Sequence, residues 1–422
     1  MKQLTLDGLN LDRKYPVLEV HESLIDLPEP YRLQVDNNLL SRFTDTFEVW
    51  VSNSSSNKLS YKTHGVFRYF GKFPPPIARH LVESYSMPGE VVVDCMCGSG
   101  TTGLECMLLG RGGNLYDVNP LAILLSMVKT TKIKEADALR AVENVCREAS
   151  LSKPDPSNVE VKGLKNLDHW FLPSTKQTLE AIRIAIRNYH GPDHIRNFLL
   201  VAFAAIVRKV SRATKQQGRL FLDKETAIED AIPTFKDRGT AIASAVASLP
   251  DGPEVIVTQL SMLDDGAAEA FPPAPLIICH PPYFNNYKFS RVNSLELAWL
   301  GYVPSDIAKN EVREAFKMGK PERLPEYLAD MEKVFRNLEV ATNPDTIIAL
   351  MIGDTIIRGE YIPVTAALLG KVLDLGFEVE KVAYRIPKGT EASWVTSQRR
   401  KSDRLGVMLC DYVIIMRRGN RG

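Results

Sequence analysis

Residues 90–120 read EVVVDCMCGSGTTGLECMLLGRGGNLYDVNP, and this stretch decides the fold. The β-branched run at 91–93 is too short for a helix and is typical of a buried parallel strand. A glycine-rich turn follows, helical spacing resumes at 102–109, and 114–118 reads as a second strand before Pro120, which can open a second helix. Strand, turn, helix and strand in this order predict a doubly wound α/β fold.

The rest of the chain predicts one α/β core interrupted by helices. Residues 1–65 have mixed patterning and read as an N-terminal extension with one or two helices. Within 132–250 the pattern is predominantly helical, with helices expected at 134–149, 174–189, 195–210 and 239–248. From 251 onward strands return between helices expected at 321–337 and 362–375, and the expected strands are 254–259, 275–280, 345–352, 377–385 and 408–416.

The composition is that of an ordinary globular protein. The chain has 422 residues, 45% hydrophobic and 24% charged, and no apolar run approaches the roughly 20 residues that span a bilayer. The N-terminus lacks the apolar segment of a signal peptide, so we expect a cytoplasmic location. Six scattered cysteines, with a lone C-x-C at 95–97, predict neither disulfides nor a metal site. The net charge of +1 does not indicate a polyanionic partner, although a local basic face would suffice.

The glycine-rich turn is the first motif that carries chemistry. Gly98 and Gly100 let the backbone approach a ligand closely, and the following helix points its amides into the turn. The turn lacks G-x-G-x-x-G spacing and a phosphate-loop lysine, so a dinucleotide or ATP is disfavoured. Asp117 ends the second strand, 23 residues after Asp94, where an acidic side chain suits a ribose diol. A helix cap before Pro120 is the alternative role for Asp117.

The second motif is LIICHPPY at 276–283, an apolar strand that runs into a Pro-Pro turn. Pro281 and Pro282 fix two φ angles and remove two donors, which makes a rigid ledge with free carbonyls. Tyr283 beside the ledge is suited to stacking on a planar base extruded from a duplex. A turn with a packed tyrosine is the alternative interpretation of this motif taken alone.

Together the two motifs resemble the amino-methyltransferases, which modify N6 of adenine or N4 of cytosine in DNA. The block FRYFGKFPPP at 67–76 resembles the segment that contacts the cofactor upstream of the glycine turn in that family. The resemblance implies a Rossmann-like seven-stranded methyltransferase sheet with helices on both faces and an inserted helical module. Its last strand, 408–416, would insert antiparallel. Residues 66–131 would form the cofactor-binding half of the core, 132–250 the helical insert for target recognition, and 251–422 the catalytic half.

The resemblance also implies S-adenosylmethionine as the cofactor and assigns residues to it. The expected cofactor-binding residues are Lys72, Phe73, Asp94, Cys95, Cys97, Gly98, Gly100, Thr101, Thr102, Asp117, Val118, Asn119 and Asp264. The expected catalytic ledge is His280, Pro281, Pro282 and Tyr283. Two acceptors on the ledge would grip the amino hydrogens of a flipped base and localise its nitrogen lone pair for direct methyl transfer.

His280 departs from the family, which usually has Asp, Asn or Ser at this position. A neutral imidazole has one acceptor nitrogen and can replace the usual oxygen, whereas a protonated one is a donor only. The departure leaves open a catalytically silent nucleic-acid-binding subunit. An RNA methyltransferase of the tRNA guanine-N2 type is the other alternative. No cysteine follows a proline, which argues against a carbon-5 cytosine methylase.

Basic side chains predict where nucleic acid would bind. Clusters of this kind are most often solvated faces, but in a base-modifying enzyme phosphate contact is the better interpretation. The expected contacts are Arg208, Lys209, Arg212, Lys215, Arg219, Lys288, Arg291, Arg399, Arg400 and Lys401. The expected partner is double-stranded DNA, in a restriction–modification or other defence system whose cleavage activity lies in a separate protein, with no membrane involved.

Overall fold

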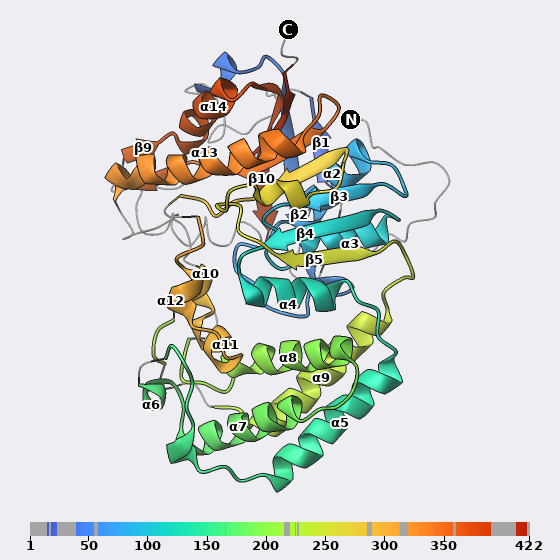
Figure 1. The fold of residues 1–422 in the computed structure, drawn as a ribbon, viewed down its shortest axis with the longest axis vertical. Coiled ribbons are helices and arrows are strands. Elements are labelled where there is room, and N and C mark those ends of the chain that lie inside the picture. The colour runs from blue at the N-terminus through green and yellow to red at the C-terminus, as the bar shows by residue number, and fades with distance from the viewer. Residues whose placement is uncertain are drawn as a thin grey trace.

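The computed structural model describes residues 15–16, 18–22, 39–54, 58–164, 166–214, 220–223, 225, 228–284, 289–312, 320–357, 360–389 and 411–419. Within them nine strands form one sheet, in the order β1-β2-β10-β11-β7-β6-β3-β4-β5 (Figure 1). The strands are β1 (Leu18–His21), β2 (Phe47–Ser54), β3 (Val91–Asp94), β4 (Gly112–Asp117), β5 (Val255–Gln259), β6 (Leu276–Cys279), β7 (Ile347–Ile352), β10 (Phe377–Gly389) and β11 (Asp411–Arg418). A separate hairpin pairs β8 (Thr355–Ile357) with β9 (Glu360–Ile362).

Seven of these strands, from β10 to β5, form the expected methyltransferase sheet. β5, β4, β3, β6 and β7 run parallel to one another. β11 runs antiparallel to both β7 and β10, with Tyr412 opposite Ile352 on one side and Tyr384 on the other. The predicted Rossmann-like sheet with an antiparallel last strand is therefore confirmed.

The N-terminal extension differs from the expectation of helices. Apart from two short 3₁₀ turns, η2 (Leu39–Arg42) and η3 (Lys58–Ser60), its described residues add β1 and β2 to the sheet. β2 lies parallel to β10, with Val49 opposite Tyr384. Val49 and Val51 are buried on one face of the sheet and Trp50 is buried on the other. This alternation has the period of a strand buried on both faces, and its flanking polar residues obscured it in the sequence.

Helices cover both faces of the sheet, as the fold prediction required. α2 (Pro75–Tyr85) packs on one face, where its Leu81 shares a buried cluster with Ile278. α3 (Thr101–Leu108) packs beside α2. α13 (Leu324–Ala341) and α14 (Val364–Asp374) cover the other face, where Met331 clusters with Ile277. Adjacent residues of β6 thus face opposite layers, as the two-residue period of a strand requires.

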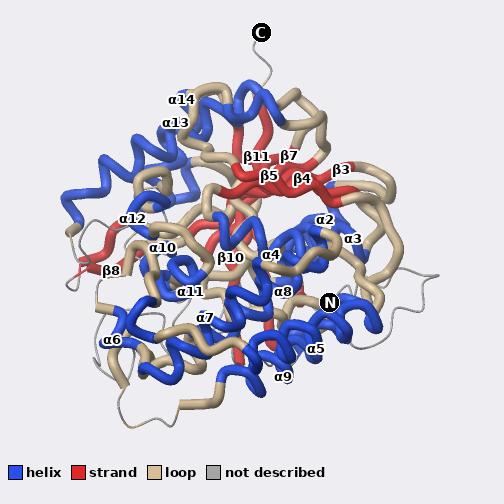
Figure 2. The backbone as a smooth tube through the Cα atoms, turned by 60° about the horizontal axis from the view of Figure 1, so that its bottom comes forward, coloured by secondary structure: helices blue, strands red, loops and turns tan. Residues whose placement is uncertain are grey.

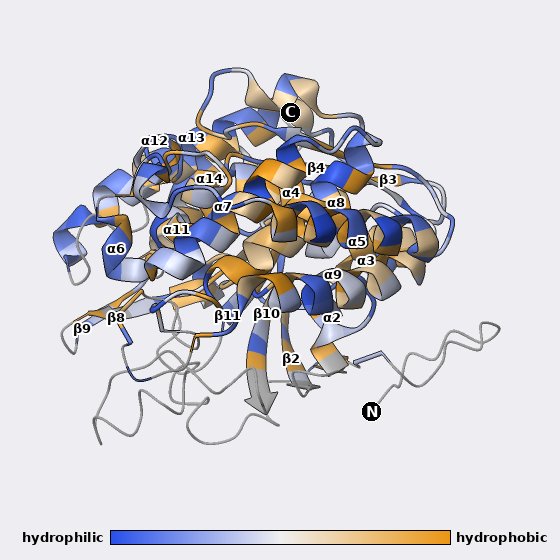
Figure 3. Ribbon diagram, turned by 90° about the horizontal axis from the view of Figure 1, so that it is seen from below, coloured by the Kyte–Doolittle hydropathy of each residue, from blue (hydrophilic) through white to orange (hydrophobic). Residues whose placement is uncertain are grey.

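A helical module with a hydrophobic core of its own interrupts the sheet between β4 and β5. Figure 1 shows its helices grouped below the strands, Figure 2 brings this side of the molecule forward, and Figure 3 shows hydrophilic and hydrophobic residues mixed along the helices. Its elements are α5 (Glu135–Leu151), η4 (Pro156–Asn158), α6 (Leu167–Trp170), α7 (Pro173–Arg187), α8 (Asp193–Val207) and α9 (Ala231–Ala247). α4 (Pro120–Lys129) joins the module to the sheet, because its Leu121 and Leu125 belong to the module's core.

The chain returns to this module after β6. Following η5 (Ala267–Ala270) and β6, the short helices α10 (Phe289–Val292), α11 (Ser294–Trp299) and α12 (Pro304–Ile307) lie against it, and η6 (Pro321–Arg323) leads into α13. Trp299 is fully buried in the module's core, with its ring centroid 5.5 Å from that of Phe171. Within the described residues, no helix combines the length and apolar character needed to cross a bilayer.

Candidate active site

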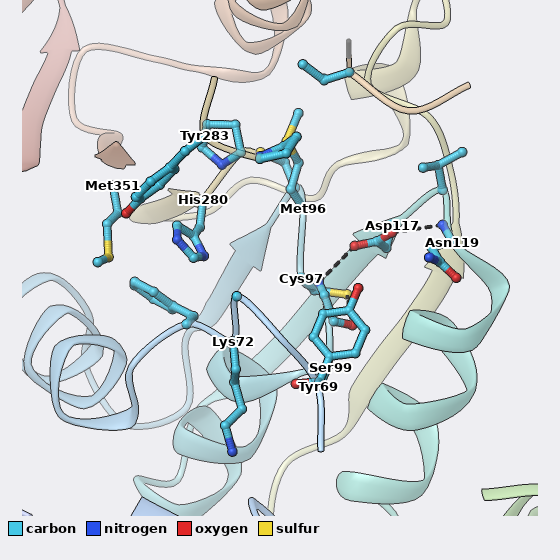
Figure 4. Close-up of a pocket in the computed structure, with 18 of the residues that line it drawn as sticks. Tyr69, Lys72, Met96, Cys97, Ser99, Asp117, Asn119, His280, Tyr283 and Met351 are labelled. Atoms are coloured by element: carbon cyan, nitrogen blue, oxygen red, sulfur yellow. Dashed lines mark hydrogen bonds between the residues drawn. The ribbon is translucent and has the colours of Figure 1, made fainter. Parts of the chain in front are cut away.

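A cavity of about 380 Å³ opens at the carboxyl ends of β3, β4 and β6. Loops that follow parallel strands meet at this edge of a doubly wound sheet, where such folds bind ligands. Figure 4 shows the side chains of the upstream block, the glycine turn and the Pro-Pro ledge converging on it. Of the expected site residues, those that line it are Lys72, Phe73, Cys95, Cys97, Gly98, Asp117, Val118, Asn119, His280, Pro281, Pro282 and Tyr283.

The glycine turn has the backbone conformation that its sequence predicts. Gly98 and Gly100 have φ of +51° and +75°, in the left-handed region that favours glycine. A Cβ on Gly100 would lie 2.7 Å from the Ser126 hydroxyl and 2.8 Å from the Ser126 Cα in α4. The turn therefore needs glycine at 100 both for its conformation and for the close approach of α4.

Asp117 links the end of β4 to this turn. Its carboxylate accepts hydrogen bonds from the backbone amides of Gly98 and Asn119, each at 2.8 Å (Figure 4). Burial raises the pKa of Asp117 to about 6. Asn119, rather than Asp117, caps α4, because its side-chain oxygen accepts from the amide of Leu121 at 3.0 Å.

Asn119 also offers a donor that the described residues leave unused. Its side-chain nitrogen Nδ2 is buried and has no hydrogen-bond partner among them. A buried amide hydrogen of this kind needs an acceptor, and Asn119 lines the cavity beside Asp117. The cavity wall at the end of β4 therefore combines a carboxylate acceptor and an amide donor, a pair that suits a polar ligand carrying hydroxyl groups.

The upstream block closes the cavity on the side of the ledge. The ammonium of Lys72 donates to the carbonyl of His64 at 2.8 Å, and burial lowers the pKa of Lys72 to about 8. The ring of Phe73 lies 5.0 Å from the imidazole of His280. Tyr69 lies over the turn, since a Cβ on Gly98 would be 3.4 Å from its ring.

His280 lies directly after β6, between the rings of Phe73 and Tyr283. Its ring centroid is 5.5 Å from that of Tyr283, with the two planes at 85°. Burial, and secondarily the charge of Arg385, lower the pKa of His280 to about 3. The imidazole is therefore neutral near pH 7 and keeps an acceptor nitrogen. The hydroxyl of Tyr283 is buried without a hydrogen-bond partner among the described residues.

Parts of the chain match a known family and known proteins in sequence. The family described as DNA methylase, which groups N6 and N4 methyltransferases, matches residues 21–126. The type II methyltransferase M.MvaI of Kocuria varians is 25% identical over 178 residues, 40% of this chain and 38% of that protein. Over these regions the chain resembles the DNA amino-methyltransferases. The type II methyltransferase M.MjaII of Methanocaldococcus jannaschii is 31% identical over 78 residues, 18% of this chain and 15% of that protein.

The chain thus spans well under half the length of each of these two relatives. Solved structures align with it only loosely. TrmN from Thermus thermophilus has a TM-score of 0.32 and 12% identity, over 82% of this chain and 49% of that one. An S-adenosylmethionine-dependent methyltransferase from Methanosarcina mazei has a TM-score of 0.31 and 9% identity, over 80% of this chain and 96% of that one.

Several of the expected site residues do not line the cavity: Asp94, Gly100, Thr101, Thr102 and Asp264. Asp94 is buried beneath the turn, where it accepts from the Thr102 hydroxyl and from the amide of Met96 at 3.1 Å. Its burial raises the pKa of Asp94 to about 7. Asp264 is exposed, and its backbone carbonyl accepts from the side-chain amide of Asn337 at 2.8 Å. Residues 260–263, directly after β5, line the cavity in its place.

The cavity also has walls that were not predicted from the sequence. Arg385 on β10 and Asp411 on β11 line it, with Arg385 Nη1 donating to Asp411 Oδ2 at 2.8 Å. Residues 260–263 could have been found, because they follow a strand that ends at the same edge. Nothing in the sequence shows that 385 and 411 face each other, since that depends on the register of two antiparallel strands. Further lining residues are Leu59, Tyr69, Gly71, Pro74, Pro75, Met96, Ser99, Asn310, Glu311, Val312 and Met351.

The basic residues expected at the nucleic acid are spread over different environments. Arg208 is buried, donates to the carbonyl of Val292 and forms an ion pair with Glu296 at 3.5 Å, so its expected phosphate contact is wrong. Arg212 is partly buried and donates to the carbonyl of Asp168, while Lys209 and Arg291 are exposed. The others lie outside the described residues: Lys215, Arg219, Lys288, Arg399, Arg400 and Lys401.

Proposed function

We propose that this protein transfers a methyl group from S-adenosylmethionine to an exocyclic amino group, N4 of cytosine or N6 of adenine, of a base flipped out of duplex DNA. One observation carries the proposal. The polar wall at Asp117 and the ledge at His280 belong to a single cavity, although they lie 163 positions apart in sequence, with the helical module between them. The match of residues 21–126 to the DNA methylase family and the likeness to a type II methyltransferase support it.

The residues at the end of β4 fit the cofactor. The carboxylate of Asp117 would accept from the ribose hydroxyls, and the unused amide of Asn119 would donate to the nucleoside. Gly98 lets the backbone approach the methionine end without a side chain between them. When bound there, S-adenosylmethionine supplies an electrophilic methyl group on a sulfonium.

The ledge would prepare the nucleophile. An aromatic amine is a poor nucleophile because its lone pair is delocalised into the ring. The neutral imidazole of His280 and a carbonyl of the Pro-Pro turn would each accept one amino hydrogen, which localises that lone pair. Tyr283 would stack on the base. The cavity would then hold the amino nitrogen toward the cofactor end, so that orientation supplies much of the acceleration.

A transfer assay with tritiated methyl donor tests this proposal. Purified protein would receive unmethylated duplex DNA and bulk tRNA in parallel, followed by mass spectrometry of the product nucleosides. Label in DNA as N4-methylcytosine or N6-methyladenine is the expected result. Label in tRNA alone would replace the proposal with an RNA methyltransferase. Cofactor binding without label in either substrate would identify a silent nucleic-acid-binding subunit.

We further propose that modification is site-specific and belongs to a restriction–modification system, with α5–α9 as the target-recognition module. The type II methyltransferases among its relatives support this proposal. Residues 66–131 would hold the cofactor and 251–422 would carry the catalytic ledge. Sequencing the labelled DNA at base resolution tests it: modification confined to one short sequence is expected, and modification scattered over unrelated sequences would contradict it.

A further inference from the structure

We infer that Arg385 and Asp411 read the Watson–Crick edge of the flipped base and select cytosine over adenine. The inference rests on the proposed function and names the base that the site takes. The pair lies where β10 and β11 meet, with the two residues directly opposite in the ladder. Both line the same cavity as His280 and Tyr283, yet their side chains are only 8% and 14% exposed.

Gly353, which follows β7, lies between the Arg385–Asp411 pair and the ledge, and its surroundings show how close the two are. A Cβ placed on Gly353 would lie 3.1 Å from Asp411 Oδ1 and 3.1 Å from Cε2 of the Tyr283 ring. The Asp411 carboxylate therefore lies next to the ring on which the base would stack. Arg385 is near enough to His280 for its charge to disfavour a protonated imidazole, which agrees with this placement.

An ion pair in this place is better explained by a ligand than by stability. Removing two charges from water costs about as much as their attraction returns, so a buried pair is weak evidence for stabilisation. Asp411 holds the guanidinium of Arg385 in the cavity wall through a bond of 2.8 Å. An arginine fixed in this way presents parallel N–H donors to a planar ligand with adjacent acceptors.

Cytosine matches this donor pattern and adenine does not. In cytosine the carbon that bears the amino group is followed along the ring edge by two acceptors, N3 and then the carbonyl oxygen O2. In adenine the corresponding edge offers the acceptor N1 and then a C–H group. With the amino group gripped at His280, the guanidinium would bond N3 and O2 of cytosine together, whereas adenine would leave one donor facing a carbon.

The first test is the identity of the methylated base in the transfer assay with wild-type protein. N4-methylcytosine as the product in DNA is expected. N6-methyladenine in DNA would overturn the inference while leaving the proposed amino-methyltransferase activity intact. An absence of any methylated base in DNA would overturn both, so the two failures are distinguishable.

The second test compares variants of two arginine–carboxylate pairs on the same strands. We expect Arg385→Met to lower kcat/KM for DNA by about 10- to 100-fold, the range for losing one bidentate contact to a base. Arg385→Lys should recover only part of that loss, because an ammonium lacks the planar fork. The matched control is Arg417→Met, which removes the exposed Arg417–Glu380 pair between β10 and β11 outside the cavity, and should keep the wild-type rate.

Two outcomes would overturn the role of Arg385. One is equal activity of Arg385→Met and Arg417→Met, and the other is full recovery with lysine. Calorimetric binding of S-adenosylmethionine should be unchanged in each variant, which shows that the cofactor end is folded.

A modified substrate tests the same contact in the wild-type protein. Replacing the methylated cytosine by 2-thiocytosine exchanges O2 for sulfur, a weaker hydrogen-bond acceptor. It should slow the wild type at least fivefold, and an unchanged rate would contradict the bond to O2.

Discussion

At the scale of single residues, His280 determines whether the ledge can work. Because the pKa of its imidazole is lowered to about 3, the ring stays an acceptor throughout the range in which the protein would be assayed. We expect His280→Asn to keep most of the transfer rate, because an amide oxygen supplies the same acceptor. His280→Ala should lose about 100-fold in kcat, the order of effect seen when one preorganised hydrogen-bond partner is removed.

The pH dependence of kcat checks this account at saturating cofactor. With His280 neutral above its lowered pKa, kcat should show no titration near pH 6.5 in the wild type or in His280→Asn. A fall in wild-type kcat with a midpoint near pH 6.5, absent from His280→Asn, would mean that the imidazole titrates normally and would contradict the buried neutral acceptor.

Asp117 predicts a different pH effect, on cofactor affinity. Burial raises the pKa of its carboxyl to about 6, so the group gains a proton as the pH falls through that value. The protonated form loses acceptor capacity toward the ribose, and the Kd for S-adenosylmethionine should rise up to tenfold per pH unit below about 6. Asp117→Asn should bind more weakly at pH 8 and lack this pH dependence. Calorimetry across pH 5–8 measures both, and parallel curves for the two proteins would contradict the assignment.

At the scale of elements, Gly100 before α3 and Gly110 after α3 differ in why each position needs glycine. Gly100 and Gly110 have φ of +75° and +72°, but a Cβ would collide with Ser126 at Gly100 and meet nothing within 4 Å at Gly110. Gly110→Ala should therefore lower the free energy of unfolding by only about 1–2 kcal/mol, because alanine is disfavoured in the left-handed conformation. Gly100→Ala should cost about 1–3 kcal/mol more through overpacking. Urea denaturation measures the difference, and equal losses would show that α4 yields to the added methyl.

The sequence predicted elements whose signals are local. β3, the glycine turn and the end of β4 follow one another within 27 residues, so their placement at one sheet edge could be inferred without distant contacts. Asp264 was misplaced by a few residues, because a strand pattern does not show how far the following loop carries each side chain. β2 depends on a partner strand far away in the sequence, whereas the Arg385–Asp411 pair depends on the register of two antiparallel strands, which no local pattern encodes.

At the scale of the whole molecule, Arg208 ties the helical module to α11, which follows β6 in the chain. Its guanidinium pairs with Glu296 of α11, and both side chains are at most 11% exposed. Arg208→Met should lower the free energy of unfolding by roughly 3–5 kcal/mol, because it leaves a buried carboxylate without its counter-charge. The neighbouring Lys209 is exposed, and Lys209→Met should change stability by less than about 0.5 kcal/mol.

The salt dependence of DNA binding should distinguish the exposed Lys209 from the buried Arg208. Lys209→Met should reduce the slope of log K against log salt by about 1 if its side chain contacts a phosphate. Arg208→Met should leave that slope unchanged under conditions in which the variant is folded. A reduced slope without loss of stability in Arg208→Met would contradict the buried position of this arginine.

The pairing of β2 with β10 has a consequence for how the protein is made. The ion pair of Glu48 with Lys381 joins residues 333 positions apart, and Trp50 of β2 shares a buried cluster with Ala383 of β10. A ribosome releases β2 early, while its partner strand emerges only after most of the chain has been translated. Until then a strand with apolar residues on both faces has no sheet to join, which favours aggregation. We therefore expect the yield of folded protein in cells to depend on chaperones that hold the nascent N-terminal segment.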